Sequence, residues 1–258
     1  MFCKRALWVF HTTTERTGNM HLTDIHCHLL PGVDDGPDTI KGAGRLLDLM
    51  KEEGVERIIV TPHFHPEIFE TSMERIQRFH GGLREMARRR RIRLYLGCEF
   101  YRCPEMIHLL AEGGRPSMAE SSYVLVEFAP DDVYQTVRNY IYELRSQGWK
   151  PIIAHVERYE CCYRDSRRVR ELAELGASIQ VNASAVLGKR GVRTKSFCKN
   201  LIEADLVSFI ASDAHDERGR RPNLGKCARY VAKKCGQDYA RKIFEENPEK
   251  ILRDRRRK

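Results

Sequence analysis

Short apolar segments rich in β-branched residues alternate with longer amphipathic segments along almost the whole chain. This alternation is typical of strand–helix units whose strands lie parallel in one sheet. Strands are expected at His21–His26, Arg57–Thr61, Arg93–Glu99, Tyr123–Phe128, Pro151–His155, Ser178–Asn182 and Val207–Ser212. Because no long polar linker interrupts them, these units predict a single parallel α/β barrel rather than two small domains.

The segments between the strands have the apolar spacing and the end signals of helices. Helices are expected at Thr39–Glu53, Ser72–Arg90, Asp131–Gln147, Ser166–Leu175 and Arg193–Glu203. Gly54, Gly148 and Gly176 follow three of them, at the position where glycine commonly ends a helix. Leu224–Leu252 is expected to form two closing helices, with Pro248 opening the last turn.

Composition excludes several classes of protein. The chain has 258 residues and 41% hydrophobic content, enough for a substantial core, and no apolar run approaches the roughly 20 residues that cross a bilayer. Nine cysteines without a CxxC pair do not suit a disulfide scaffold. Part of the net charge of +9 lies in Arg88–Arg91 and Arg255–Lys258. Neither run contains aromatic residues that stack on bases, so no stable nucleic-acid binding is expected, while docking of an acidic or phosphorylated partner stays open.

The first 19 residues differ from the rest of the chain. Their apolar patch, Ala6–Phe10, is too short for a secretion signal, and no small-residue cleavage site follows it. Met20 stands directly before the first expected strand. We therefore expect residues 1–19 to be a disordered extension or the product of a misassigned start. Residues 20–258 are expected to form one domain, and the protein is expected to be cytoplasmic.

Ionisable side chains follow most of the expected strands at their carboxyl ends. They are His26 and His28, His63, Glu99, Glu127, His155, and Asp213 with His215. In α/β barrels the loops that converge at this end form the active site. His26 and His28 alternate, so they lie on the same face of the strand, where two neutral imidazoles can bind a metal ion. So many ionisable groups around one opening are electrostatically costly unless cations compensate them, which indicates a metal centre.

Six short motifs occur in a fixed order: DIHCHLLPGVDDGP from residue 24, TPH from 61, GCEFY from 97, AHVERY from 154, VNASAVLGKRG from 181 and SDAH from 212. DIHCH, TPH, GCEFY, AHVERY and SDAH, in this order, resemble the signature of the PHP (polymerase and histidinol phosphatase) superfamily. Within it, DIHCHLLPGVDDGP together with VNASAVLGKRG and AHVERY is similar to the bacterial manganese-dependent tyrosine phosphatases of the CpsB/CapC type, which regulate capsule and exopolysaccharide synthesis. The resemblance extends from about Thr23 to about Leu252 and implies a distorted, TIM-like (β/α)7 barrel.

The same resemblance implies a centre of three divalent metal ions. The implied ligands are His26, His28 and Asp213 for the first ion, Glu99 as a bridge to a second ion completed by Glu127 and His155, and Asp35, His63 and His215 for the third. Imidazole and carboxylate ligands without thiolate suit Mn²⁺, Fe or Zn²⁺. The resemblance favours manganese.

The implied reaction is hydrolysis of phosphotyrosine in a protein by a metal-activated hydroxide. Arg158 and Arg220 resemble the phosphate-binding arginines of the family. Arg221 leaves the register of the second arginine open, and Arg158 could instead form a salt bridge with Glu157 or another surface acid. The expected partner is the tyrosine-rich tail of a membrane-associated autokinase of polysaccharide synthesis. The sequence does not define the oligomeric state.

Three other functions stay open. A phosphatase with a cysteine nucleophile needs a cysteine and an arginine separated by five residues, a spacing found at Cys161–Arg167, Cys162–Arg168 and Cys235–Arg241. None of these segments has the glycine-rich interior that cradles a phosphate. A histidinol-phosphate phosphatase, or a phosphoesterase of nucleotides or nucleic acids, would use the same metal chemistry. A non-catalytic binding module is disfavoured by the complete set of ligands.

Overall fold

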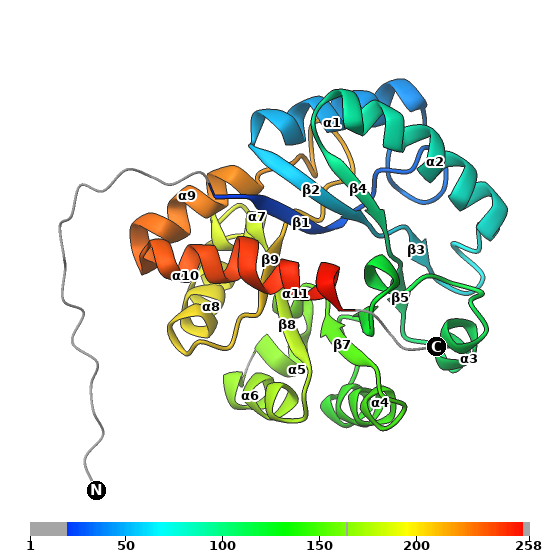
Figure 1. The fold of residues 1–258 in the computed structure, drawn as a ribbon. Coiled ribbons are helices and arrows are strands. Elements are labelled where there is room, and N and C mark those ends of the chain that lie inside the picture. The colour runs from blue at the N-terminus through cyan, green and yellow to red at the C-terminus, as the bar shows by residue number, and fades with distance from the viewer. Residues whose placement is uncertain (1–19, 164, 255–258) are drawn as a thin grey trace, which may run out of the picture.

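Among residues 20–163 and 165–254, which this computed structural model describes, nine strands curl into a distorted barrel with helices around its outside (Figure 1). The strands are β1 (Leu22–Cys27), β2 (Val55–Val60), β3 (His63–Phe64), β4 (Arg93–Leu96), β5 (Glu99–Tyr101), β6 (Tyr123–Glu127), β7 (Lys150–Ile153), β8 (Ser178–Asn182) and β9 (Phe209–Ala211). The α-helices are α1 (Ile40–Glu52), α2 (Met73–Arg89), α3 (Met106–Ala111), α4 (Tyr134–Ser146), α5 (Glu160–Tyr163), α6 (Ser166–Glu174), α7 (Ala183–Val186), α8 (Val192–Glu203), α9 (Leu224–Cys235), α10 (Gln237–Arg241) and α11 (Asn247–Arg253). Short 3-10 turns lie at Met118–Glu120 and Val156–Arg158, and a π-helical turn at Lys242–Glu246.

The strands pair in parallel in two sheets that together form a ring. Their orders are β1-β2-β4 and β3-β5-β6-β7-β8-β9. One junction is bridged where the backbone N–H of Glu99 donates to the carbonyl of Pro62 at 3.1 Å. At the other junction the backbone N–H of His28 donates to the carbonyl of Ala214 at 2.9 Å, directly beyond β9. The parallel α/β barrel predicted from the sequence is therefore confirmed.

All seven expected strands are present, but the third is divided in two. Gly97 and Cys98 separate β4 from β5. A Cβ atom at Gly97 would lie 2.9 Å from the sulfur of Met118 and 3.0 Å from a methyl carbon of Ile59, so only glycine fits at this break. The two-residue β3 was not expected, because it is too short to have a pattern of its own.

The expected helices begin close to their predicted positions, with one clear exception. Thr39 caps α1 by accepting a hydrogen bond from the backbone N–H of Gly42 at 3.1 Å. The helix expected from Asp131 begins only at Tyr134, because Asp132 forms a turn in which its side chain accepts the backbone N–H of Ala129 at 2.9 Å. The final segment, expected as two helices, continues after α9 as α10, the π-helical turn and α11. Helices α3, α5 and α7 were not expected.

The core has two layers. A large cluster of buried side chains lies between the strands and the outer helices. A smaller cluster packs residues of the strands, such as Ile25, Ile59 and Leu125, against Ile251 and Leu252 of α11. Every helix among the described residues is too short or too polar to cross a lipid bilayer. The expectation of a disordered extension at residues 1–19 concerns a segment outside the described residues.

Candidate metal centre

Glu99, the first residue of β5, lies at the centre of a cluster of imidazoles at the carboxyl ends of the strands. Its Oε2 atom is 3.1 Å from each of three nitrogens: His26 Nε2, His28 Nε2 and His63 Nδ1. Its Oε1 atom is 2.9 Å from His155 Nε2. Because the Glu99 side chain is buried, water does not screen these contacts. One carboxylate thus contacts four histidines that come from three separate parts of the chain: the end of β1, β3 and the segment after β7.

All nine residues predicted as ligands belong to four overlapping groups. Within each group the potential ligand atoms lie within 4.8 Å of one another. The groups are His28 with Asp35, His63 and His215; His26 with Glu99 and His155; His26 with His28 and Asp213; and His63 with Glu99 and Glu127. His28 thus joins the set that was expected to contain Asp35, His63 and His215 alone. The structure brings the nine side chains together, and their roles as ligands stay a prediction.

The donor atoms of this cluster fit divalent cations. Among the described residues, Glu99 Oε2 and His215 Nε2 are buried and have no hydrogen-bond partner. His26 Nε2 and His28 Nε2 face each other at 3.3 Å, with the same carboxylate oxygen beside both. Buried nitrogen and oxygen atoms that converge in this way, without enough protons to share, are typical of a metal site. A set of imidazoles and carboxylates without thiolate suits Mn²⁺, Fe or Zn²⁺.

The charges within the cluster favour the same conclusion. Burial raises the pKa of Glu127 to about 8, and the negative charge of Glu99 adds to this effect. Burial would also raise the pKa of Glu99, but the charges of His26 and His63 hold it well below its usual value. Burial and the neighbouring Arg158 lower the pKa of His155 to about 4, so its ring is neutral at pH 7. The ring of His155 and the carboxylate of Glu99 are thus in the forms that bind metals, and a divalent cation would offset the repulsion between Glu99 and Glu127.

The sequence analysis missed Asp34, which orients two of the histidines. Its Oδ2 atom lies 2.8 Å from His28 Nδ1 and accepts the backbone N–H of His63 at 2.9 Å. Its Oδ1 atom accepts the backbone N–H of Gly36 at 3.0 Å, which holds the carboxylate in place. The sequence signal for Asp34 was its position directly before Asp35. When one of two adjacent carboxylates is a predicted ligand, the other can orient a neighbouring histidine.

Gln180 and Asn182 of β8 support the opposite side of the cluster and were also missed. Gln180 Oε1 lies 3.1 Å from His26 Nδ1 and accepts the backbone N–H of His155 at 2.8 Å. Gln180 Nε2 donates to Asn182 Oδ1 at 2.9 Å, and Asn182 Nδ2 donates to Asp213 Oδ2 at 2.7 Å. Gln180 and Asn182 alternate with the apolar Ile179 and Val181 and so lie on one face of the strand, and this spacing was the signal for them.

Two of the predicted ligands have a left-handed backbone. The φ angle is 30° at His155 and 52° at Asp213, values that non-glycine residues adopt at a cost of roughly 1–3 kcal/mol each. The backbone N–H of Asp213 donates to the carbonyl of His26 at 2.9 Å, so the neighbouring strand stabilises this turn. Backbone strain of this kind concentrates at functional sites, where it directs a side chain that a regular strand would point elsewhere.

The two predicted arginines both reach the cluster. Arg158 forms an ion pair with Asp213 Oδ2, and its expected alternative partner Glu157 instead accepts the backbone N–H of Asn182 at 3.1 Å. Arg220 Nη2 donates to Asp213 Oδ1 at 2.8 Å, and its Nη1 donates to Asp35 Oδ2 at 3.1 Å. Arg220 therefore contacts two of the predicted ligands, and its role in binding phosphate stays a prediction.

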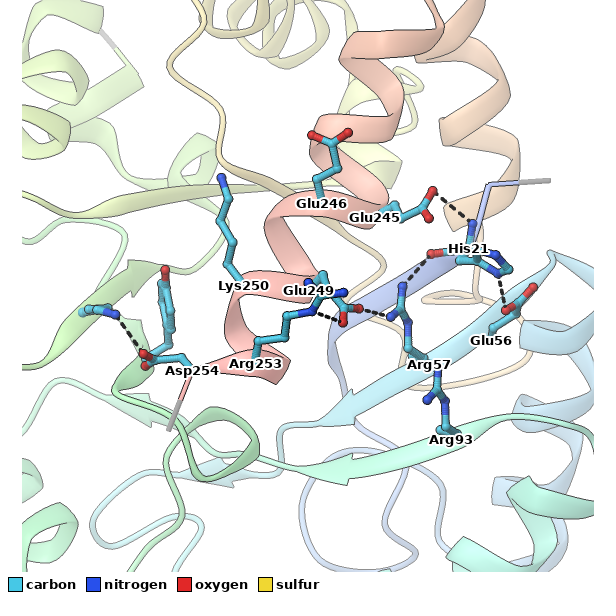
Figure 2. A pocket seen from close by; sticks show the side chains of 12 residues that line it. His21, Glu56, Arg57, Arg93, Glu245, Glu246, Glu249, Lys250, Arg253 and Asp254 are labelled. Carbon is cyan, nitrogen blue, oxygen red and sulfur yellow. Dashed lines mark hydrogen bonds and ion pairs between the residues drawn. The ribbon is translucent and has the colours of Figure 1, made fainter. Parts of the chain in front are cut away.

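A large cavity lies at the end of the barrel opposite the cluster around Glu99, where the strands begin. Its volume is about 920 Å³, and it is lined by five acidic and five basic side chains (Figure 2). Many of them pair with one another: Arg57 with Glu249, and Lys150 with Asp254 at 3.0 Å. Balanced charges at the amino-terminal end of a barrel stabilise the fold, whereas catalytic residues lie at the other end. The size of this cavity therefore does not make it the functional site.

A family model described as "Capsular polysaccharide synthesis, CpsB/CapC" matches residues 22–253 of the chain. The tyrosine-protein phosphatase CpsB of Streptococcus pneumoniae is 32% identical over 240 residues, which cover 90% of this chain and 99% of that protein. The chain also matches a crystal structure with a TM-score of 0.84 and 27% identity. That structure comes from a report on YwqE from Bacillus subtilis and CpsB from Streptococcus pneumoniae, described as unique metal-dependent tyrosine phosphatases. This match covers 91% of this chain and 96% of that chain.

A more distant structure shares the fold. Histidinol phosphate phosphatase from Lactococcus lactis matches with a TM-score of 0.56 and 15% identity, over 84% of this chain and 94% of that chain. At this level of identity the likeness concerns the architecture alone.

Proposed function

Because the chain belongs to the CpsB/CapC family, we propose that it is a metal-dependent tyrosine-protein phosphatase that hydrolyses phosphotyrosine at the cluster around Glu99. One observation carries this proposal. A single buried carboxylate lies within 3.1 Å of nitrogens from four histidines, and two arginines reach the same cluster. Converging ligands and phosphate-binding forks are what the hydrolysis of a phosphate dianion requires.

The residues of the chain have distinct roles in this proposal. Divalent cations, when bound, screen the charge of the phosphate and lower the pKa of water so that a hydroxide nucleophile is available at neutral pH. Asp34 and Gln180 hold the rings of His28 and His26 so that their Nε2 atoms face the cluster. Arg158 and Arg220 bind phosphate oxygens through their planar guanidinium groups.

The leaving group needs little assistance. The phenol of tyrosine has a pKa near 10, so it departs as a phenolate more readily than an alkoxide does. We assign no general acid to this chain. The residues around the opening therefore serve mainly to bind the phosphate and to exclude competing groups.

The finer points of the proposal rest on the family resemblance and on the ligand set. We propose three ions, most favourably Mn²⁺, with His26, His28, Asp35, His63, Glu99, Glu127, His155, Asp213 and His215 as ligands. The proposed substrate is the tyrosine-rich tail of a membrane-associated autokinase of polysaccharide synthesis, reached from the cytoplasm. Residues 20–258 are proposed to form one domain.

Turnover of a phosphotyrosine peptide by purified protein, measured beside its metal content, tests this function. EDTA is expected to abolish turnover, Mn²⁺ to restore it after the chelator is removed, and iodoacetamide to leave it intact. Histidinol phosphate and single-stranded DNA belong in the same assay, and faster turnover of either one would replace phosphotyrosine as the proposed substrate. Loss of activity with iodoacetamide but not with EDTA would overturn the metal assignment.

A pair of histidine variants provides the matched control. His155→Ala removes a buried imidazole beside Glu99, whereas His108→Ala removes an exposed imidazole on α3 that pairs with Glu112, away from the cluster. The first variant is expected to lose bound metal and activity together, and the second to keep both. Full activity and metal content in His155→Ala would contradict the proposed centre.

A further inference from the structure

A small pocket with an unusual concentration of positive charge adjoins the metal cluster. Its volume is about 140 Å³, and its walls include Asp213 and Arg220 together with three further cations, Lys189, Arg190 and Arg221. Lys189 and Arg190 follow α7, and Arg221 lies in the segment before α9. The pocket is therefore built by two loops at the carboxyl ends of the strands, next to the atoms that the proposed function assigns to the phosphate.

The side chains of these three cations have no partner in the part of the chain that the structure describes. Among residues 20–163 and 165–254, the side chains of Lys189, Arg190 and Arg221 form no hydrogen bond or ion pair, although Arg158 and Arg220 nearby are both paired with Asp213. Partial burial and repulsion by Arg158 and Arg220 lower the pKa of Arg190 and outweigh the attraction of Asp213 and Glu157, which raises it. The cations that line the pocket outnumber its one carboxylate, Asp213, which Arg158 and Arg220 already pair with, and such an excess of positive charge attracts an anion.

Two buried atoms in the pocket also point to a ligand. Asn223 is only 4% exposed and lines the pocket, yet its Oδ1 atom has no hydrogen-bond partner among the described residues. Arg220 Nε is likewise buried and without a partner there. An acceptor and a donor left unpaired beside excess positive charge suit a peptide, which supplies backbone N–H groups and carbonyls as well as an anionic side chain.

The position of the pocket limits what the anion can be. Asp213 and Arg220 belong both to the walls of the pocket and to the cluster that the proposed function assigns to the phosphotyrosine phosphate. A group bound in the pocket therefore lies next to that phosphate. In a protein substrate, such a group belongs to a residue that flanks the phosphotyrosine in sequence.

We propose that this pocket is a second anion subsite, in which Lys189, Arg190 and Arg221 bind an anionic side chain that flanks the phosphotyrosine of the substrate. This inference rests on the proposed function and specifies the class of protein sequence on which it acts. A carboxylate and a second phosphate have the same chemistry for this subsite, and the peptides below distinguish them.

Three peptides of one sequence test the subsite: they carry glutamate, glutamine or a second phosphotyrosine beside the reacting phosphotyrosine. With the full chain loaded with Mn²⁺, kcat/KM for the glutamate peptide is expected to exceed that of the glutamine peptide roughly fivefold to tenfold at low salt. Higher salt should reduce this ratio, because the contact is partly exposed. If kcat/KM for the doubly phosphorylated peptide exceeds that for the glutamate peptide, phosphate is the preferred anion.

The double variant Arg190→Gln/Arg221→Gln is expected to bring the glutamate-to-glutamine ratio close to one. Arg193→Gln is the matched control, since Arg193 is an exposed arginine of α8 outside the pocket, and this variant should keep the wild-type ratio. Circular dichroism checks that each variant is folded. A double variant that is folded and keeps the full preference would overturn the proposal, as would wild-type protein that handles all three peptides alike.

A binding measurement separates this proposal from the proposed function. Fluorescence anisotropy with non-hydrolysable phosphonate versions of the peptides reports the preference without turnover. If no peptide is hydrolysed but the glutamate peptide still binds more tightly and the double variant loses this preference, the activity is wrong and the subsite stands. If hydrolysis occurs without any difference in binding or rate between the peptides, the activity stands and the subsite is wrong.

Discussion

Asp34 Oδ2 lies 2.8 Å from Nδ1 of His28, and the other nitrogen of the ring lies 3.1 Å from Glu99 Oε2. The carboxylate of Asp34 thus orients the imidazole of His28, and the carboxylate of Glu99 faces the nitrogen on its other side. Burial by itself would lower the pKa of His28, but the charge of Asp34 and the hydrogen bond to it raise the pKa to about 10. A carboxylate behind a ligating histidine fixes its tautomer and makes it a stronger donor to a metal.

The variant Asp34→Asn is expected to weaken metal binding about 10-fold to 100-fold, because the amide cannot supply the negative charge behind His28. Titration of Mn²⁺ into metal-free protein, followed by calorimetry, measures this change. Asp38→Asn is the control, since Asp38 is an exposed carboxylate in the same loop. Equal affinities in the two variants would show that the contact with Asp34 does not tune the site.

The variant Arg158→Lys is expected to lower kcat/KM for a phosphotyrosine peptide by about 10-fold or more, because lysine lacks the planar fork that binds two phosphate oxygens. Arg167→Lys provides the control, since the side chain of Arg167 is 86% exposed and pairs with Asp165. Metal content is measured in parallel by elemental analysis. Loss of metal in proportion to activity would assign Arg158 to holding Asp213 rather than to binding phosphate.

The thiol of Cys161 is expected to react at unusually low pH. A hydrogen bond from Cys162 and the nearby charge of Arg168 lower the pKa of Cys161 to about 7, whereas burial raises the pKa of Cys235. Because the thiolate is the reactive form, alkylation of Cys161 by iodoacetamide should be half-maximal near pH 7, and that of Cys235 only at higher pH. Peptide mass spectrometry measures both rates. Cys162→Ala should shift the midpoint of Cys161 upward, and no shift would show that the hydrogen bond is not the cause.

Two glycine-to-alanine substitutions are expected to change stability in opposite directions. A Cβ atom at Gly225 would lie 1.9 Å from the carbonyl oxygen of Glu53, so Gly225→Ala forces α9 away from the end of α1 and should cost about 2 kcal/mol or more. Gly81, inside α2, has no heavy atom within 4 Å of such a Cβ, so Gly81→Ala should stabilise by about 0.5–1 kcal/mol. Urea unfolding measures both changes, and a neutral effect at Gly225 would contradict the close packing of the two helices.

Much of the architecture follows from local patterns in the chain. Alternation of β-branched runs with amphipathic segments predicted the seven strands of a parallel barrel, because each strand and helix carries its own periodicity. Elements of about one period, such as β3 with two residues and α7 with four, are too short for a periodic pattern to be detected. Gly97 lies at the break in the third strand, where Met118 and Ile59, remote in sequence, leave little room for a side chain.

The proposed ligand residues were recognisable because ionisable side chains recur at the carboxyl ends of successive strands and because the motifs that contain them resemble those of a known family. His26, Glu99 and Asp213 could therefore be named from the sequence, and the barrel explains why strand ends so far apart in the chain meet at one point. Only the folded chain shows that Asp34, rather than Asp35, lies behind His28. It also shows that Arg220, rather than Arg221, pairs with Asp213, and that the side chain of Arg190 has no partner among the described residues. These facts are distances between residues separated in sequence, and only the closed ring of strands decides them.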